Sequence, residues 1–161
     1  MSESIQPKYT PEQIIAKLQA HPKFGSQIKP ITKHQSAIIS SGLEPAVVIA
    51  GAGSGKTETM SNRVLYLVAN GFATPDQILG LTFTRKAAGE LSVRIRKRLR
   101  QLSQLPEFKH ITSNSTAVTT YHSYAGKLLS EHAIRYGIDA DAEPLGEAAI
   151  WQIASDVVRN W

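Results

Sequence analysis

The sequence contains no cysteine and no long apolar run. Without cysteine, the chain can form neither disulfide bonds nor thiolate metal sites. Its five histidines include no closely spaced pair of the kind that binds a metal ion. No apolar stretch approaches the ~18 residues that span a bilayer, and the polar N-terminus lacks a signal-peptide pattern. We therefore expect a soluble, cytoplasmic protein that has no membrane partner.

Excess positive charge is confined to one segment. Residues 85–100 hold seven basic residues and one acidic residue, a net charge of +6. The rest of the chain carries 11 basic and 12 acidic residues, a net charge of −1. This segment therefore favours a polyanionic partner. At about 100° per residue, the cations at 94–100 spread around more than one helix face. Only some of them can follow a nucleic-acid backbone, so we select none as a site residue.

Residues 50–57 read Ala-Gly-Ala-Gly-Ser-Gly-Lys-Thr and follow an apolar run at 45–50. This pattern is typical of a phosphate-binding loop, in which backbone N–H groups and a helix N-terminus face an anion. Lys56 would reach the β- and γ-phosphates, and the Thr57 hydroxyl would hold Mg²⁺. The strict pattern has glycine where this chain has alanine at its first position. The predicted nucleotide-binding residues are Ala50, Gly51, Ala52, Gly53, Ser54, Gly55, Lys56 and Thr57, the last two also as catalytic residues.

Strand-like and helix-like patterns alternate along the chain. Strands are expected at 45–50, 78–84 and 117–121. Helices are expected from 10, from 32, at 56–70, at 86–102, from about 121 to 137, and over an amphipathic stretch at 150–161. Residues 103–116 and 137–146 are expected to be irregular. This alternation predicts an α/β fold with a parallel sheet, whose ligands would lie at the carboxyl ends of the strands.

Three motifs in order give the chain a resemblance to a known family. Gln35 precedes the phosphate loop, residues 81–88 read Leu-Thr-Phe-Thr-Arg-Lys-Ala-Ala, and residues 120–125 read Thr-Tyr-His-Ser-Tyr-Ala. These segments are similar to the Q motif, motif Ia and motif Ib of superfamily 1 DNA helicases of the UvrD/Rep/PcrA type. The first helix and Glu58-Thr-Met60 also resemble the AddAB/AdnAB helicase–nuclease branch.

The resemblance implies a partial RecA-like P-loop domain with parallel strands flanked by helices. Residues 1–136 would form the N-terminal part of the ATP-binding domain 1A, and 137–161 would begin the helical insertion 1B. The intact protein would be an ATP-dependent 3′→5′ DNA helicase or translocase that uses ATP and Mg²⁺ in DNA repair or recombination. Its partners would be single-stranded or duplex-junction DNA, a second RecA-like lobe of its own chain, and a helicase–nuclease subunit.

The 161 residues lack some of the parts that phosphoryl transfer needs. No apolar strand ending in Asp-Glu is present to hold Mg²⁺ and position water, and the chain ends within an amphipathic pattern. We expect this portion alone to be inactive or nearly so. Two other interpretations stay open, namely a self-contained small P-loop nucleotide kinase or NTPase, and a non-catalytic nucleic-acid-binding module.

Gln35 has two competing roles. The resemblance implies that its amide reads the adenine edge, since an amide both donates and accepts hydrogen bonds. Gln35 also lies three residues after Thr32, which is the spacing of a helix capping box. The same Thr-x-x-Gln spacing recurs at Thr10 and Thr74, where nothing indicates adenine.

The resemblance also implies contacts to single-stranded DNA through phosphates and aromatic stacking. The predicted DNA-binding residues are Thr82, Phe83, Thr84, Arg85, Thr120, Tyr121 and His122. Phe83 could instead be a core strand residue, because Thr82 and Thr84 share the opposite face of the strand. The family often has Asn at the position of Arg85 and usually Phe at that of Tyr121, and both changes keep the required chemistry.

Glu58 departs from the family more seriously. Many of these helicases have an arginine at this position, packed against the nucleotide base. A carboxylate cannot make that cation–π contact. Base stacking is therefore expected to come from elsewhere or to be weaker.

Overall fold

The computed structural model describes residues 6–111, 116–139 and 145–161, so the predicted irregular segments lie partly outside it. The chain divides into two compact units, Met1–Thr120 and Tyr121–Trp161. This division falls upstream of the domain boundary expected after residue 136, which stays a prediction. The elements of the first unit are α1 (Pro11–Gln19), η1 (Gly25–Gln27), α2 (Lys33–Ile39), α3 (Lys56–Ala69), η2 (Pro75–Gln77), β1 (Leu79–Thr82), α4 (Arg85–Leu102), η3 (Pro106–Phe108) and β2 (Ala117–Thr120).

The three Thr-x-x-Gln signatures all form capping boxes at the starts of α1, α2 and η2. At α1, for example, the Thr10 backbone N–H donates to Gln13 Oε1 over 2.9 Å, and the Gln13 N–H donates back to Thr10 Oγ1 over 3.3 Å. The first N–H groups of a helix have no partner within the helix, so these reciprocal bonds fix where each helix begins. The sequence therefore predicted these helix starts correctly.

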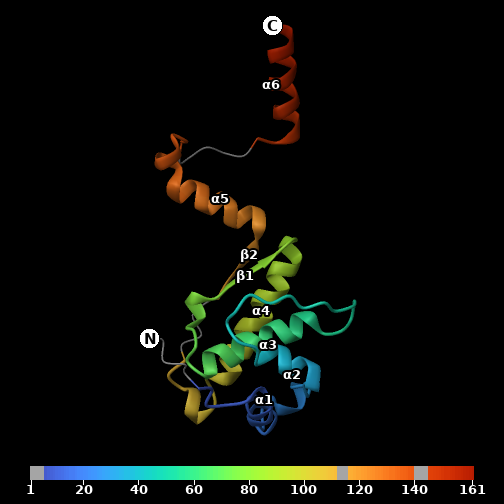
Figure 1. Cartoon of the computed structure of the whole chain (residues 1–161), viewed down its shortest axis with the longest axis vertical. Helices are drawn as coiled ribbons and strands as arrows, with labels where there is room; N and C mark the ends of the chain where they lie inside the picture. The colour runs from blue at the N-terminus through green and yellow to red at the C-terminus, as the bar shows by residue number, and fades with distance from the viewer. Residues whose placement is uncertain (1–5, 112–115, 140–144) are drawn as a thin grey trace. The chain divides into compact units, whose positions relative to one another are not determined.

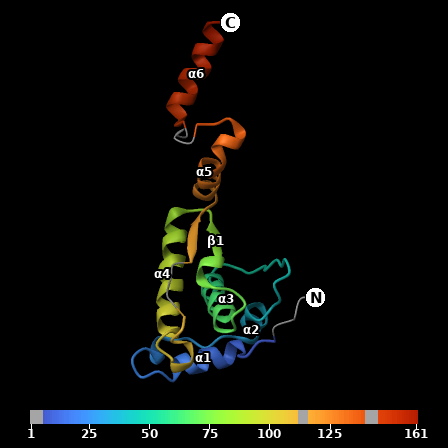
Figure 2. The same cartoon turned by 90° about the vertical axis from the view of Figure 1, so that its left-hand side faces the viewer.

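Strands β1 and β2 form a parallel pair, in which Leu79 faces Ala117 and Thr82 faces Thr120. Figure 1 shows the two strands side by side, and Figure 2 shows α4 running along them. Helix α4 contacts both strands, as expected for a helix that connects two parallel strands. The prediction of an α/β fold with parallel strands flanked by helices is confirmed.

The expected strand at 45–50 is wrong, because this segment is neither helix nor strand in the structure. Its apolar side chains are exposed, with 89% of the Val47 surface and 96% of the Ile49 surface accessible. A strand needs a neighbour to pair its N–H and C=O groups. Within the part of the chain that the structure describes, β1 and β2 pair with each other and neither pairs with this segment.

The core of the first unit lies between its helices. Leu18 of α1, Ile39 of α2, Leu65 of α3 and Leu99 of α4 are all almost completely buried in one cluster. The cluster also takes in Leu105, Phe108 and Ile111, and the Phe108 ring packs edge-on against Tyr9 with centroids 5.1 Å apart. Sequence periodicity missed this contribution, because the apolar residues around η3 are spaced too irregularly to show a helix face.

The second unit contains α5 (Tyr121–His132), η4 (Ala133–Tyr136) and α6 (Glu147–Arg159). The amphipathic pattern correctly predicted a helix near the end of the chain. Its apolar side chains are exposed, however, and Trp151 and Val158 are among the most exposed. Among the described residues, no helix is both long enough and apolar enough to cross a membrane.

Glu58 ties the first turn of α3 to α4. Its two carboxylate oxygens accept hydrogen bonds from Arg94 Nη1 and Arg98 Nη2, each over 2.6 Å. Burial of the carboxylate opposes its ionisation. The hydrogen bonds from Arg98 and Arg94 outweigh this effect and hold the pKa of Glu58 below its ordinary value. The residue that departs from the family pattern therefore holds two helices together.

We predict that Glu58→Gln destabilises the chain by about 1–2 kcal/mol, between the values typical of exposed and buried ion pairs. Because the pKa of Glu58 is lowered by folding, its contribution is complete above the ordinary glutamate pKa. The contribution disappears as the pH falls through the lowered value. Urea unfolding from pH 7 to pH 3 measures the effect, and the variant should lose part of the acid-dependent destabilisation.

Glu107→Gln is the matched control, because Glu107 pairs with Lys17 at an exposed site away from α3 and α4. Its loss should leave the free energy of unfolding nearly unchanged, because exposed ion pairs contribute little to stability. Equal effects of the two substitutions would show that the Glu58 pairs are ordinary surface contacts.

Candidate functional site

The glycine-rich loop at 51–55 leads directly into α3. Gly53 and Gly55 have φ angles of +75° and +87°, and Gly55 is the N-cap residue of the helix. Residues with a Cβ rarely adopt this left-handed conformation, so glycine at these two positions lets the chain turn sharply into α3. The first backbone N–H groups of α3 have no partner within the helix and therefore give this helix start a partial positive charge.

Lys56 folds back over the loop that precedes it. Its Nζ donates to the carbonyl oxygen of Ala50 over 3.1 Å and to that of Gly51 over 2.6 Å. The Gly51 carbonyl also accepts a 2.9 Å hydrogen bond from Ser54 Oγ. The ammonium group is thus held at the mouth of the loop, while Ala52 and Thr57 are exposed on the turn and on the first turn of α3.

Gln35 forms the predicted capping box and also contacts the loop. Its Oε1 accepts from the Thr32 N–H over 3.0 Å, and its Nε2 donates to the Ser54 carbonyl over 3.3 Å. A Cβ added to Gly55 would lie only 2.9 Å from Gln35 Nε2. The glycine at this position therefore provides room for the glutamine as well as for the turn. The capping role is confirmed, and the adenine role stays a prediction.

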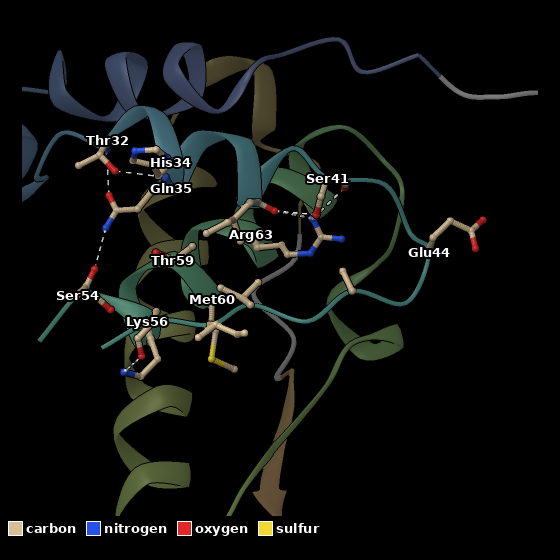
Figure 3. Close-up of a pocket in the computed structure, with 15 residues that line it drawn as sticks. Thr32, His34, Gln35, Ser41, Glu44, Ser54, Lys56, Thr59, Met60 and Arg63 are labelled. Carbon is tan, nitrogen blue, oxygen red and sulfur yellow. Dashed lines mark hydrogen bonds between the residues drawn. The ribbon is translucent and has the colours of Figure 1, made fainter. Parts of the chain in front are cut away.

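A cavity of about 630 Å³ lies beside the loop, between α2, α3 and the segment 44–50. Figure 3 shows Gln35, Ser54 and Lys56 at one end of it and Arg63 at the other. Met60 of α3 is half-exposed and also lines this cavity. The structure therefore gathers the predicted residues Gln35, Ala50, Ser54 and Lys56 around one opening.

Arg63 also lines this cavity, although no sequence pattern indicated it. Its guanidinium donates to the carbonyl oxygens of Ile38, Ile39, Ser41 and Gly42 at the end of α2. These acceptors lie 21 to 25 residues upstream of Arg63. An arginine on the polar face of a helix has no local signal for such a distant contact.

The segment that resembles motif Ia forms the junction of β1 and α4. Thr82 ends the strand, and its Oγ1 donates to the Thr84 carbonyl over 3.1 Å. Thr84 is the N-cap of α4, accepting from the Ala87 N–H over 3.1 Å, and Arg85 begins the helix. Phe83 is 88% exposed, so the alternative that it is a core strand residue is wrong.

The segment that resembles motif Ib spans the boundary between the two units. Thr120 ends β2 in the first unit and is buried, while Tyr121 and His122 begin α5 in the second unit and are exposed. An exposed ring and an exposed imidazole can contact a ligand without rearrangement. A direct contact from Thr120 would require its surroundings to open.

The cations of α4 are divided among several roles. Arg94 and Arg98 bind Glu58, and Lys97 Nζ donates to Gln27 Oε1 over 3.1 Å. These three cations therefore hold elements of the protein together. Leaving residues 94–100 out of the predicted DNA site is consistent with this arrangement.

Residues 31–160 match the UvrD/REP helicase N-terminal domain. The ATP-dependent DNA helicase PcrA of Staphylococcus epidermidis is 28% identical over 136 residues, which cover 83% of this chain and 17% of that protein. The probable DNA helicase II homolog of Mycoplasma pneumoniae is 38% identical over 112 residues, covering 69% of this chain and 14% of that protein.

The chain thus spans about one sixth of the length of these curated relatives. The family match covers most of the chain, including the phosphate loop, the β1–α4 junction and the β2–α5 junction. It agrees with the order of motifs read from the sequence and with the parallel strands of the structure. The chain belongs to the UvrD/REP helicase N-terminal domain family.

Proposed function

We propose that this chain is the ATP-binding amino-terminal portion of an ATP-dependent DNA helicase or translocase. The observation that carries the proposal is the loop at the start of α3, where Lys56 and Gln35 converge within a helicase-family domain. The matched protein from Staphylococcus epidermidis is named an ATP-dependent DNA helicase, which supports the same activity here. Family membership favours this proposal over a small nucleotide kinase.

The residues of the loop suit the phosphates of a nucleoside triphosphate. Lys56 places its ammonium against the carbonyls of Ala50 and Gly51, where an incoming phosphate would compete for the same donors. The exposed Thr57 hydroxyl would serve as one ligand of Mg²⁺, which usually keeps several water ligands and binds substrate phosphates. When bound, ATP supplies the phosphoanhydride bond whose hydrolysis drives the motor.

Gln35 can contribute to the base side of the same site. An amide has two N–H donors and two lone pairs on its oxygen. The bonds to the Thr32 N–H and the Ser54 carbonyl use one lone pair and one donor. The second lone pair and the second donor are enough to read an adenine edge, so the capping and adenine roles are compatible.

The DNA-facing residues that we propose are those exposed at the ends of the two strands. Phe83 offers an exposed ring for base stacking. Thr84 and Arg85 lie at the N-terminus of α4, where the helix dipole favours a phosphate. Tyr121 and His122 offer further stacking and hydrogen-bonding groups. Thr82 and the buried Thr120 would then act by shaping these strand ends.

The whole protein is proposed to translocate 3′→5′ on single-stranded DNA in repair or recombination. A second RecA-like lobe would complete the ATP site, and the partner subunit would be of the helicase–nuclease kind. We expect no ATP hydrolysis by these 161 residues alone and strand-stimulated hydrolysis when they are part of the complete protein. Turnover by the 161 residues without DNA would favour a self-contained NTPase instead.

We predict that Lys56→Ala weakens ATP binding about 10- to 100-fold, because charge-assisted hydrogen bonds contribute ~1.5–3 kcal/mol. Titration of a fluorescent ATP analogue with Mg²⁺ measures the change. Lys86→Ala, which removes a lysine of α4 outside the cavity, should leave ATP affinity unchanged. An unaltered ATP affinity in Lys56→Ala would remove the support for a phosphate site at this loop.

We predict that Phe83→Ala weakens single-stranded DNA binding about 5- to 100-fold, because each base stacked on an aromatic ring contributes ~1–3 kcal/mol. Its thermal stability should stay close to that of the parent chain, since the ring is exposed. Val93→Ala removes another exposed apolar side chain, from the middle of α4, and should bind DNA normally. Fluorescence anisotropy with a labelled oligonucleotide at two salt concentrations distinguishes the variants, and equal losses would argue against stacking on Phe83.

A further inference from the structure

Of the side chains drawn in Figure 3, Arg63 makes the most hydrogen bonds to a distant part of the chain, and all of them reach residues 38–42 at the end of α2. Its Nη1 lies 3.2 Å from the Ile38 carbonyl oxygen, 3.0 Å from that of Ile39 and 2.9 Å from that of Ser41. Its Nη2 lies 2.7 Å from the Gly42 carbonyl oxygen. One half-buried guanidinium of α3 therefore closes the C-terminal end of α2.

A helix end needs such a partner. The last carbonyl groups of a helix have no N–H partner within it, and they carry partial negative charge. Helix α2 has only seven residues, which is too short to be stable by itself. Its position therefore depends on contacts with the rest of the unit. The charged guanidinium of Arg63 makes one of these contacts.

The other end of α2 carries Gln35, which reaches the phosphate loop through a single hydrogen bond of 3.3 Å to the Ser54 carbonyl. This bond is long, so a small displacement of Gln35 would break it. A seven-residue helix is only about 10 Å long, so Gln35 and the carbonyl groups that Arg63 binds lie within two turns of each other. A shift at its Arg63 end would therefore displace Gln35 at the loop.

We propose that Arg63 is a positioning residue of the nucleotide site, which acts through α2 by keeping Gln35 against the phosphate loop. This inference rests on the proposed ATP-binding function. The planar fork of arginine is required, because its two terminal nitrogens reach four carbonyl oxygens from Ile38 to Gly42. A lysine ammonium would keep the charge but concentrate its donors at one point.

A double-mutant cycle tests the proposal. We expect Arg63→Lys and Gln35→Ala each to weaken ATP binding about five- to tenfold, as loss of one hydrogen bond would. Combining them should weaken binding no further than Gln35→Ala alone, because Arg63 acts through Gln35. Circular dichroism and thermal melting confirm that each variant is folded at the temperature of the titration. Independent, multiplying losses, or no loss in Arg63→Lys, would overturn the proposal.

Arg98→Lys is the matched control. Arg98 of α4 also joins two helices through its guanidinium, but its partner is Glu58 of α3 and not a residue of α2. In a cycle with Gln35→Ala, its effects on ATP affinity should multiply within about twofold, as for residues that share no partner. Equal coupling of Gln35 to Arg98 and to Arg63 would reduce the effect to general loss of stability and overturn the assignment.

A readout without nucleotide separates this inference from the proposed function. The side-chain amide resonance of Gln35 in a ¹H–¹⁵N spectrum should move toward its free position in Arg63→Lys and stay in place in Arg98→Lys. If the parent chain bound no ATP but this shift occurred, ATP binding would be wrong and the positioning role of Arg63 would stand. An unmoved Gln35 resonance in Arg63→Lys would overturn the positioning role whatever the ATP result.

Discussion

Helix α3 packs against α1, α2 and α4, and the core of the first unit is organised around it. Leu65 at its centre is almost completely buried among residues of the other helices. The apolar face of α3 fixes how close these helices come, since hydrophobic contact has no direction of its own. Polar side chains along α3 then fix the direction of each neighbour. Glu58 binds α4, Arg63 binds the end of α2, and Asn70 binds both the N–H and the carbonyl of Tyr9 before α1.

The first turn of α3 also belongs to the candidate site, so stability and function share the same residues. Glu58 lies next to Thr57 and two positions after Lys56, yet its carboxylate is engaged with Arg94 and Arg98. An arginine at this position, as in the resembling helicases, would repel those two cations. The departure at Glu58 is therefore compensated within α4, and this acid accounts for two of the basic residues of α4, Arg94 and Arg98.

Features set by neighbouring residues were predictable from the sequence, whereas features set by distant contacts were not. The capping boxes at Thr10, Thr32 and Thr74 depend on a side chain three residues away, and all three form. The phosphate-loop turn depends on glycines within the motif. Arg63 could not be selected, because its acceptors lie on another helix. The position of Phe83 was undecided for another reason, since alternation along a strand does not show where the strand ends.

The segment at 45–50 also shows that local sequence alone does not decide its structure. Its apolar, β-branched composition favours a strand, but composition supplies no partner for its backbone groups. Within the described residues those groups find no adjacent strand, and the side chains stay in contact with solvent. The conformation of the glycine-rich loop that follows is therefore determined by its contacts with α2 and α3. Gly55 begins α3, Lys56 folds back onto Gly51, and Gln35 holds Ser54. The conformation of this loop thus depends first on where α2 and α3 lie.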